Sequence, residues 1–296
     1  MRMRTKLLIV FCITASIVVA QAIGAYLTGS LALLTDTVHA ATDSIGLLVA
    51  LIAAFLMHRP TSSNRTWGFK RIEVIAAFFQ ATLLIGIGIY ALVEGIRRLI
   101  EPPEVPGLEL LIFGVLGLAA NILGLVILSS SRRENFNMRA AFLEVLNDAL
   151  GSVGVIVAAI VISTTGFMRA DAIASLLIVA LIIPRAYRLM TETLAVLMEF
   201  APEGLDLDEV REHILQLKHV IDVHDLHAST VATGLPTITA HVVVADECFR
   251  DGHAQGILQE VRECVLSHFE VSIEHSTFQI ETLEFSRHEP SAHQHP

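Results

Sequence analysis

Cysteine, tryptophan and charged residues are all scarce in this chain of 296 residues. The three cysteines, Cys12, Cys248 and Cys264, form no spaced motif, which excludes a disulfide-framed protein and predicts reduced thiols. Charged residues make up 17%, against about 25% in ordinary soluble domains. Apolar residues make up 53% and the mean hydropathy is +0.63, which excludes a disordered or fibrous chain and indicates a membrane protein.

The few charges are distributed unevenly along the chain. Residues 1–200 hold 15 Lys+Arg and 13 Asp+Glu, whereas residues 201–296 hold 5 and 17, together with eleven of the thirteen histidines. We therefore predict a transmembrane domain over 1–200, an acidic aqueous domain over 201–285 and a disordered His-containing tail over 286–296. An acidic domain favours cations as partners and argues against nucleic acid.

Six apolar segments are long enough to cross a bilayer as helices. We expect these transmembrane helices over residues 7–27, 31–57, 72–99, 107–130, 139–164 and 169–198. Ten Lys and Arg residues lie at the N-terminus and in the second and fourth loops, against three in the other loops, which predicts that both termini are cytoplasmic. A signal peptide is the alternative for the first segment, but its apolar run is longer than a usual signal core.

Four ionisable side chains lie inside these segments at helical spacing. His39 and Asp43 are four residues apart in the second segment, and Glu144 and Asp148 repeat this spacing in the fifth. Ionisable groups within a membrane are costly and usually functional. Two helices that face each other with these residues would bind one divalent cation, and four ligands suit tetrahedral Zn²⁺. The alternative is that the four groups bond separately to neighbouring helices.

Other polar residues in the apolar segments have simpler interpretations. Asp36 is interpreted as a helix-end or gating group, and Asp171 as a charge that matches the dipole of its own helix. Gln80 and Asn121 are interpreted as interhelical hydrogen-bonding groups.

The acidic domain is expected to have the order α-β-β-α-β. Its predicted elements are a helix over 207–218, strands over 220–231 and 237–245, a helix over 251–268 and a strand over 272–283. This order predicts a small open α+β sheet with both helices on one face. His224, His241 and His275 lie on or beside strands and are candidate ligands of a second metal, with a structural role as the alternative.

Several segments resemble the cation diffusion facilitator family of divalent-metal transporters, and together they cover nearly the whole chain. These segments are residues 29–36 leading to His39 and Asp43, residues 67–73, residues 147–152, and the stretches around His224, His241 and His275.

The resemblance implies efflux of divalent metal, with Zn²⁺ the main substrate, from the cytoplasm across the inner membrane by proton-coupled antiport with alternating access. It implies no enzymatic activity and no cofactor beyond the metal. The cytosolic domain would have a ferredoxin-like, metallochaperone-like fold, bind metal and form a homodimer. By position, the transport ligands are His39, Asp43, Glu144 and Asp148, and the cytosolic ligands are His224, His241 and His275.

The chain departs from the family pattern at Glu144, where zinc transporters of the family usually have histidine. A hard oxygen in place of a nitrogen favours Mn²⁺, Fe²⁺, Co²⁺ or Cd²⁺ as an alternative main substrate. A membrane-anchored metal sensor remains an alternative from another class. The sequence has no His-Glu-x-x-His motif, which argues against an intramembrane metalloprotease.

Overall fold

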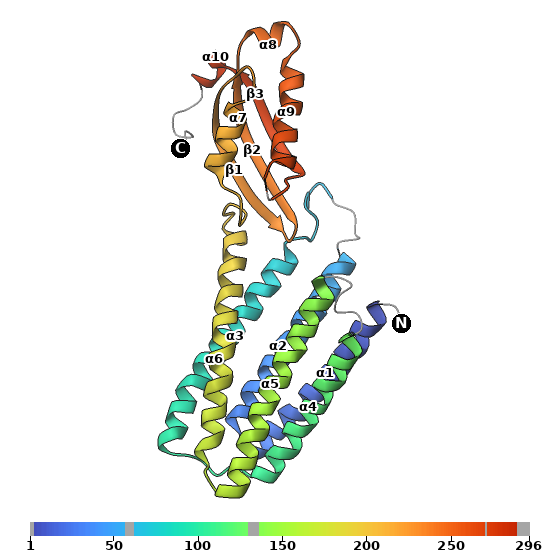
Figure 1. The fold of residues 1–296 in the computed structure, drawn as a ribbon, viewed down its shortest axis with the longest axis vertical. Coiled ribbons are helices and arrows are strands. Elements are labelled where there is room, and N and C mark those ends of the chain that lie inside the picture. The colour runs from blue at the N-terminus through green and yellow to red at the C-terminus, as the bar shows by residue number, and fades with distance from the viewer. Residues whose placement is uncertain (1–2, 57–61, 130–135, 270, 289–296) are drawn as a thin grey trace. The chain divides into compact units, whose positions relative to one another are not determined.

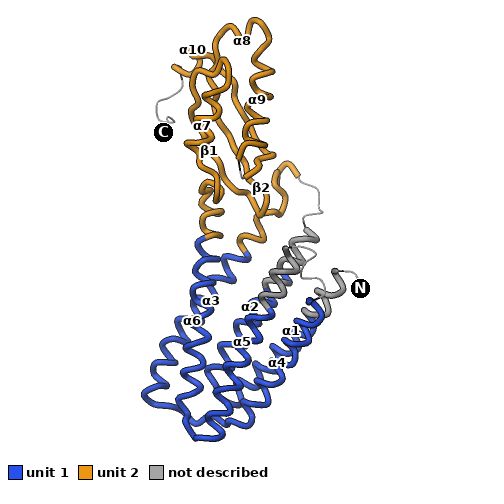
Figure 2. The backbone as a smooth tube through the Cα atoms, in the orientation of Figure 1, with its two compact units in different colours: residues 1–55, 76–191 blue, residues 56–75, 192–296 orange. Residues whose placement is uncertain are grey.

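The computed structural model describes the backbone of residues 3–56, 62–129, 136–269 and 271–288. Side chains are not described for residues 3–10, for most of 46–56, or for 136–144. The chain divides into two compact units (Figure 2). Unit 1 comprises Met1–Phe55 and Ala76–Thr191, and unit 2 comprises Leu56–Ile75 and Glu192–Pro296.

Six long helices occupy the positions predicted for the apolar segments (Figure 1). They are α1 (Met3–Thr28), α2 (Leu31–Leu56), α3 (Ile72–Ile100), α4 (Gly107–Ser129), α5 (Phe136–Thr165) and α6 (Arg169–Leu197). Within the described residues, five helices are long and apolar enough to cross a membrane, namely α1, α3, α4, α5 and α6. The sixth predicted crossing, on α2, does not meet this criterion over its described part and stays a prediction.

Small residues allow the helices of unit 1 to approach closely. Gly88 and Gly95 of α3 lie against the side chains of Ile183 and Leu176 of α6, where an added Cβ would come within 2.9 Å of a side-chain atom. The buried core of unit 1 draws mainly on alanine, valine, leucine and isoleucine from all six helices. The packing therefore depends on close helix contacts rather than on large side chains.

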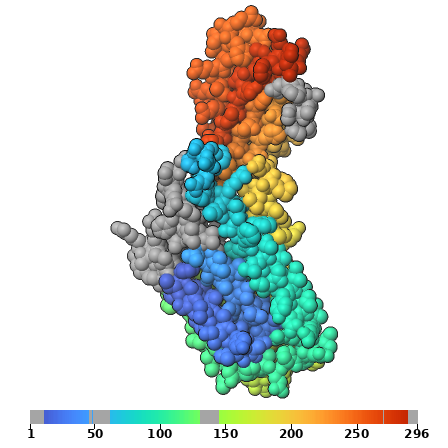
Figure 3. All heavy atoms as spheres, turned by 180° about the vertical axis from the view of Figure 1, so that it is seen from behind, coloured from blue at the N-terminus to red at the C-terminus, as the bar shows by residue number. Residues whose placement is uncertain are grey.

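The outward faces of these helices carry large apolar side chains. On α3, for example, Phe79, Tyr90 and Val93 are more than half exposed. Figure 3 shows this side of unit 1, with α3 in teal. Exposed apolar surface of this kind indicates contact with a bilayer.

The described part of unit 2 contains a three-stranded sheet and four short helices (Figure 1). These elements are α7 (Leu207–Leu215), β1 (Val220–Ala232), β2 (Leu235–Val244), α8 (Glu247–Arg250), α9 (Ala254–Ser267), β3 (His275–Thr282) and α10 (Leu283–Ser286). The strand order is β1-β2-β3; β1 pairs antiparallel with β2, and β2 pairs parallel with β3. The predicted helices and strands are all present, and α8 and α10 are additional.

The pleat of the strands separates an apolar face from a polar one. Ile238, Ala240 and Val242 of β2 are buried in a core shared with α7 and α9. Because side chains alternate across a strand, His241 lies on the opposite face. His224 is the register partner of His241, so the two imidazoles lie side by side on the face away from the helices.

The segment before α3 and the first turn of α3 pack within unit 2. The ring of Trp67 makes an edge contact with His275, with ring centroids 4.7 Å apart. Arg71 Nη2 lies 2.7 Å from Glu199 Oε1, and Glu73 accepts a hydrogen bond from the backbone N–H of Thr233. The segment between α2 and α3 is thereby attached to the sheet domain.

Candidate metal centres

Three ionisable side chains of unit 1 converge at one buried point. His39 and Asp43 lie one turn apart on α2, and Asp148 comes from α5. The Nε2 atom of His39 lies 3.7 Å from Asp43 Oδ2 and 3.7 Å from Asp148 Oδ1. All three residues are at most 9% exposed, and they offer ligand atoms within 4.8 Å of one another.

His39 and Asp43 each have one polar atom that the described residues leave without a hydrogen-bond partner. Asp43 Oδ2 and His39 Nδ1 are buried and have no hydrogen-bond partner among the described residues. Buried polar atoms normally have such a partner, because burial without one costs free energy. One imidazole and two carboxylates that face each other in this way have the donor set for a divalent first-row cation.

Glu144, the fourth predicted ligand, lies one helical turn before Asp148 in α5. Its side chain lies outside the described residues. The structure therefore brings together three of the four predicted residues, and the place of the fourth carboxylate remains a prediction.

A cavity of about 660 Å³ adjoins this group. Asp36 and His39 line it, and mostly apolar residues of α5 and α6 form its walls as far as Phe167. The cavity is open on one side, where Leu177 and Leu181 are exposed, and His39 is the member of the three-residue group that lines it.

Among the described side chains of unit 1, two further carboxylates, Asp36 and Asp171, are buried but serve other contacts. Asp36 accepts hydrogen bonds from Gln21 of α1 and Ser152 of α5, at 3.3 Å each. Gly151 of α5 leaves room for this carboxylate, since a Cβ there would overlap Asp36 Oδ1. Asp36 is therefore engaged by α1 and α5 and does not belong to the three-residue group.

Asp171 lies in the first turn of α6, as the dipole interpretation requires, and it also caps α2. Its carboxylate accepts hydrogen bonds from the hydroxyl of Ser30, from the backbone N–H of Leu31 at 2.7 Å and from that of Ala32 at 3.3 Å. The first N–H groups of a helix have no partner within it, so this carboxylate acts as a cap supplied by α6. The N-terminal end of the ligand-bearing helix is fixed to α6 in this way.

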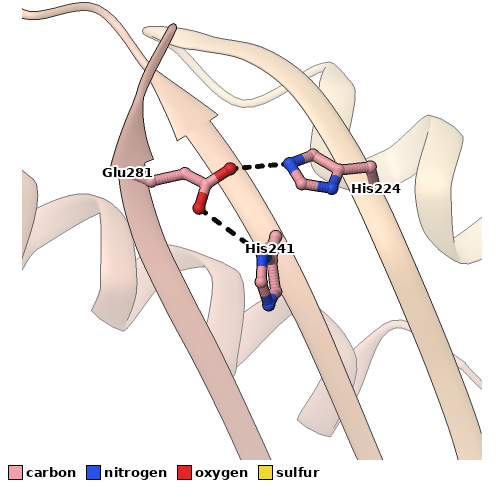
Figure 4. A group of neighbouring side chains, drawn as sticks. All are labelled: His224, His241 and Glu281. Carbon is pink, nitrogen blue, oxygen red and sulfur yellow. Dashed lines mark hydrogen bonds and ion pairs between the residues drawn. The ribbon is translucent and has the colours of Figure 1, made fainter. Parts of the chain in front are cut away.

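A second group of metal-ligand candidates lies on the polar face of the sheet in unit 2 (Figure 4). His224 Nε2 lies 2.6 Å from Glu281 Oε1, and His241 Nδ1 lies 3.4 Å from Glu281 Oε2. The two imidazole rings have centroids 5.1 Å apart. Each of the three strands contributes one residue, and both imidazoles point toward the carboxylate.

Neighbouring residues orient this second group. Gln279 donates a hydrogen bond to Glu281 Oε2 at 3.0 Å, and Ser286 lies 3.2 Å from His224 Nε2. Asp225, at positive φ in an irregular part of β1, lies 3.9 Å from His241 Nε2. Two imidazoles and a carboxylate suit Zn²⁺ or a similar ion, and three ligands leave one tetrahedral position open.

His275, which the sequence assigned to this site, lies elsewhere on β3. In the sheet register it is paired with Thr237, whereas His241 is paired with Gln279. Its ring contacts Trp67 instead. The carboxylate of Glu281 takes the third place in the group.

Comparisons with known proteins show which family this chain resembles. The profile of the cation efflux transmembrane domain matches residues 7–198, and the profile of the cation efflux protein cytoplasmic domain matches residues 202–283. A zinc transporter, ZitB, of Yersinia pseudotuberculosis is 39% identical over 93% of this chain and 87% of its own length. A metal cation efflux system protein, CzcD, of Cupriavidus metallidurans is 36% identical over 93% of this chain and 86% of its own. A cadmium, cobalt and zinc/H(+)-K(+) antiporter of Bacillus subtilis is 37% identical over 93% and 88%.

Proposed function

The chain belongs to the cation diffusion facilitator family of cation efflux proteins, and on this premise we propose that it exports a divalent transition-metal cation, chiefly Zn²⁺, from the cytoplasm in exchange for protons. The observation that carries the proposal is the buried convergence of His39, Asp43 and Asp148. Glu144 is the proposed fourth ligand. The protein would lie in the inner membrane with six crossings and both termini in the cytoplasm.

The chemistry of these side chains supports exchange between metal and protons. Metal ligands must be deprotonated, so metal binding releases protons and protons compete for the same atoms. Ionised carboxylates without a compensating charge are costly in a low-dielectric site. A site that alternates between the cytoplasm and the outside would therefore exchange a cation for protons rather than remain empty and ionised.

The identity of the main substrate depends on Glu144. Zn²⁺ is supported by the names of the relatives, which mention zinc for ZitB and cadmium, cobalt and zinc for the Bacillus antiporter. A third carboxylate in the site would also suit Mn²⁺, Fe²⁺ or Co²⁺, because these ions accept hard oxygen ligands. Cd²⁺ is kept as an alternative because the name of the Bacillus antiporter includes cadmium.

The second group, His224, His241 and Glu281, is proposed as a cytosolic metal site. Residues 201–296 carry a strong excess of acidic groups, 17 against 5 basic ones. A bound cation would relieve repulsion between two copies of this domain, and we propose that the domain forms a homodimer. The match to the cytoplasmic domain of cation efflux proteins supports this part of the proposal.

Metal flux into proteoliposomes under an imposed pH gradient tests the proposed function. The purified full-length protein should move Zn²⁺ in the direction opposite to the flow of protons down their gradient. This Zn²⁺ flux should stop when an ionophore collapses the pH gradient. Zn²⁺ flux that is indifferent to the gradient would overturn the antiport. If the protein carries no metal flux and binds metal only through residues of unit 2, the alternative of a membrane-anchored metal sensor would be favoured.

A further inference from the structure

The two oxygen atoms of Asp43 have different surroundings. Oδ2 faces His39 Nε2 at 3.7 Å and has no hydrogen-bond partner among the described residues. Oδ1 accepts a hydrogen bond from the Nε2 atom of Gln80 on α3, at 3.4 Å. One oxygen is therefore held by an amide while the other faces the proposed metal position.

From this asymmetry we propose that Gln80 is a positioning residue that sets the affinity and selectivity of the transport site. The inference rests on the proposed function of His39, Asp43 and Asp148 as metal ligands. Gln80 would hold Oδ1 so that Asp43 binds metal through Oδ2 alone. Hydrogen bonds to ligand residues commonly fix ligand orientation, and their loss typically costs about 10–100-fold in metal affinity.

One-oxygen binding by Asp43 has consequences for selectivity. Tetrahedral sites for small ions such as Zn²⁺ use single oxygen atoms at about 2.0–2.2 Å. Larger cations accept two oxygens of the same carboxylate, in more flexible arrangements. Because the Gln80 amide occupies Oδ1, it disfavours binding through both oxygens of Asp43 without adding a charge, and so favours the smaller ion.

The position of Gln80 on α3 fits this role. Phe79, the preceding residue, is 66% exposed on the outer surface, and Ala81, the following residue, is fully buried. Gln80 lies between these faces and directs its amide inward to α2. The hydrogen bond from Gln80 thus connects the ligand Asp43 to α3, a helix that supplies none of the four proposed ligands.

A purely structural interhelical hydrogen bond is the competing interpretation. Its loss would lower stability and reduce the flux of all metals alike. A positioning role instead predicts a change in KM that differs between metals. The two interpretations are therefore separable by kinetics with two ions of different size.

The experiment compares the full-length wild type with Gln80→Leu, Gln80→Asn and the control Thr82→Val in proteoliposomes. Leucine removes the amide, and asparagine keeps an amide that is one methylene too short to reach Asp43. Thr82 lies on the same helix, is exposed, and donates its hydroxyl hydrogen bond to its own helix at Phe78. Initial flux is measured against Zn²⁺ and Cd²⁺ concentration at one fixed pH gradient.

Both Gln80 variants should raise the KM for Zn²⁺ about tenfold, with Vmax within about twofold of wild type. The KM for Cd²⁺ should rise less, because the larger ion can use both oxygens of Asp43. Thr82→Val should match wild type. An unchanged KM for Zn²⁺ in Gln80→Asn, or equal losses of Vmax for both metals, would overturn the positioning role. Failure of the proposed function itself would show in the wild type, as an absence of gradient-driven flux.

Discussion

The Nε2 atom of His39 lies 3.7 Å from the Oδ1 atom of Asp148, which joins a residue of α2 to one of α5 inside unit 1. Both side chains are buried, at 7% and 4% exposure. We expect Asp148→Asn, which keeps the shape and removes the charge, to abolish metal flux, since a neutral amide oxygen is a far weaker ligand than a carboxylate. The control is Thr164→Val on the same helix, where the exposed hydroxyl bonds only within α5. If the Asp148→Asn variant in proteoliposomes carries the same flux as the wild type, this residue is excluded from the transport site.

Replacement of Glu144 tests which ion the site prefers. Glu144→His should raise the ratio of kcat/KM for Zn²⁺ to that for Mn²⁺ by roughly tenfold, because a nitrogen donor replaces a hard oxygen. The measurement is initial flux of each metal in separate assays at one pH gradient. A ratio that stays at the wild-type value would mean that Glu144 does not contact the ion.

Removal of an imidazole from the sheet tests the cytosolic site. His241→Ala should reduce the number of Zn²⁺ ions bound to the detergent-purified protein by about one per chain, because the remaining two ligands bind metal weakly. The control is His253→Ala, since His253 is exposed and pairs with Asp251 away from this group. Equal Zn²⁺ stoichiometry in wild type and His241→Ala, measured by equilibrium dialysis, would contradict the assignment.

Loss of the Asp171 cap should destabilise unit 1. Asp171→Ala removes the acceptor of the Leu31 and Ala32 N–H groups and leaves these buried donors unsatisfied. The expected cost is about 1–3 kcal/mol in the free energy of unfolding, seen as a lower midpoint in thermal melting of the detergent-solubilised protein. Asp208→Ala, at an exposed position in the first turn of α7, should leave the midpoint within about a degree. A midpoint unchanged in Asp171→Ala would show that the cap contributes little.

The two cysteines of unit 2 should react slowly in the folded protein. Burial raises the pKa of the Cys264 thiol, and burial together with the nearby carboxylates of Asp251 and Glu247 raises that of Cys248. The thiolate is the reactive form, so at pH 8 each thiol carries less thiolate than an ordinary cysteine, and the rate should climb as the pH rises toward the raised pKa. Mass spectrometry after iodoacetamide treatment should find both sites largely unlabelled in native protein and labelled in urea. Rapid native labelling would indicate that the core of unit 2 opens readily.

The helices were predictable from the sequence because their signals are local. Long apolar runs, interrupted near Gly29 and at Pro102 and Pro103, place α1 to α6 within a few residues of their observed bounds. Alternating and helical patterns likewise predicted α7, β1, β2, α9 and β3. The very short helices α8 and α10 have no such periodic pattern, which explains why the sequence did not predict them.

Contacts between distant segments were predictable only in part. Gln80 and Asn121 do form interhelical hydrogen bonds, with Asp43 and Ser152. Asp171 lies in the first turn of its own helix, as predicted, but its carboxylate also caps α2, since the fold brings the start of α6 beside the start of α2. A local charge pattern cannot reveal a partner that lies 140 residues away in the chain.

The sequence by itself determined the pairing of His39 with Asp43, because residues four apart on a helix share a face wherever the helix lies. Only the tertiary structure decided that Asp148 meets this pair and that Glu281, rather than His275, joins His224 and His241. Helix packing and strand register fix these meetings, and both depend on the fit of whole surfaces. A shift of one residue in β3 would turn Glu281 to the opposite face of the sheet.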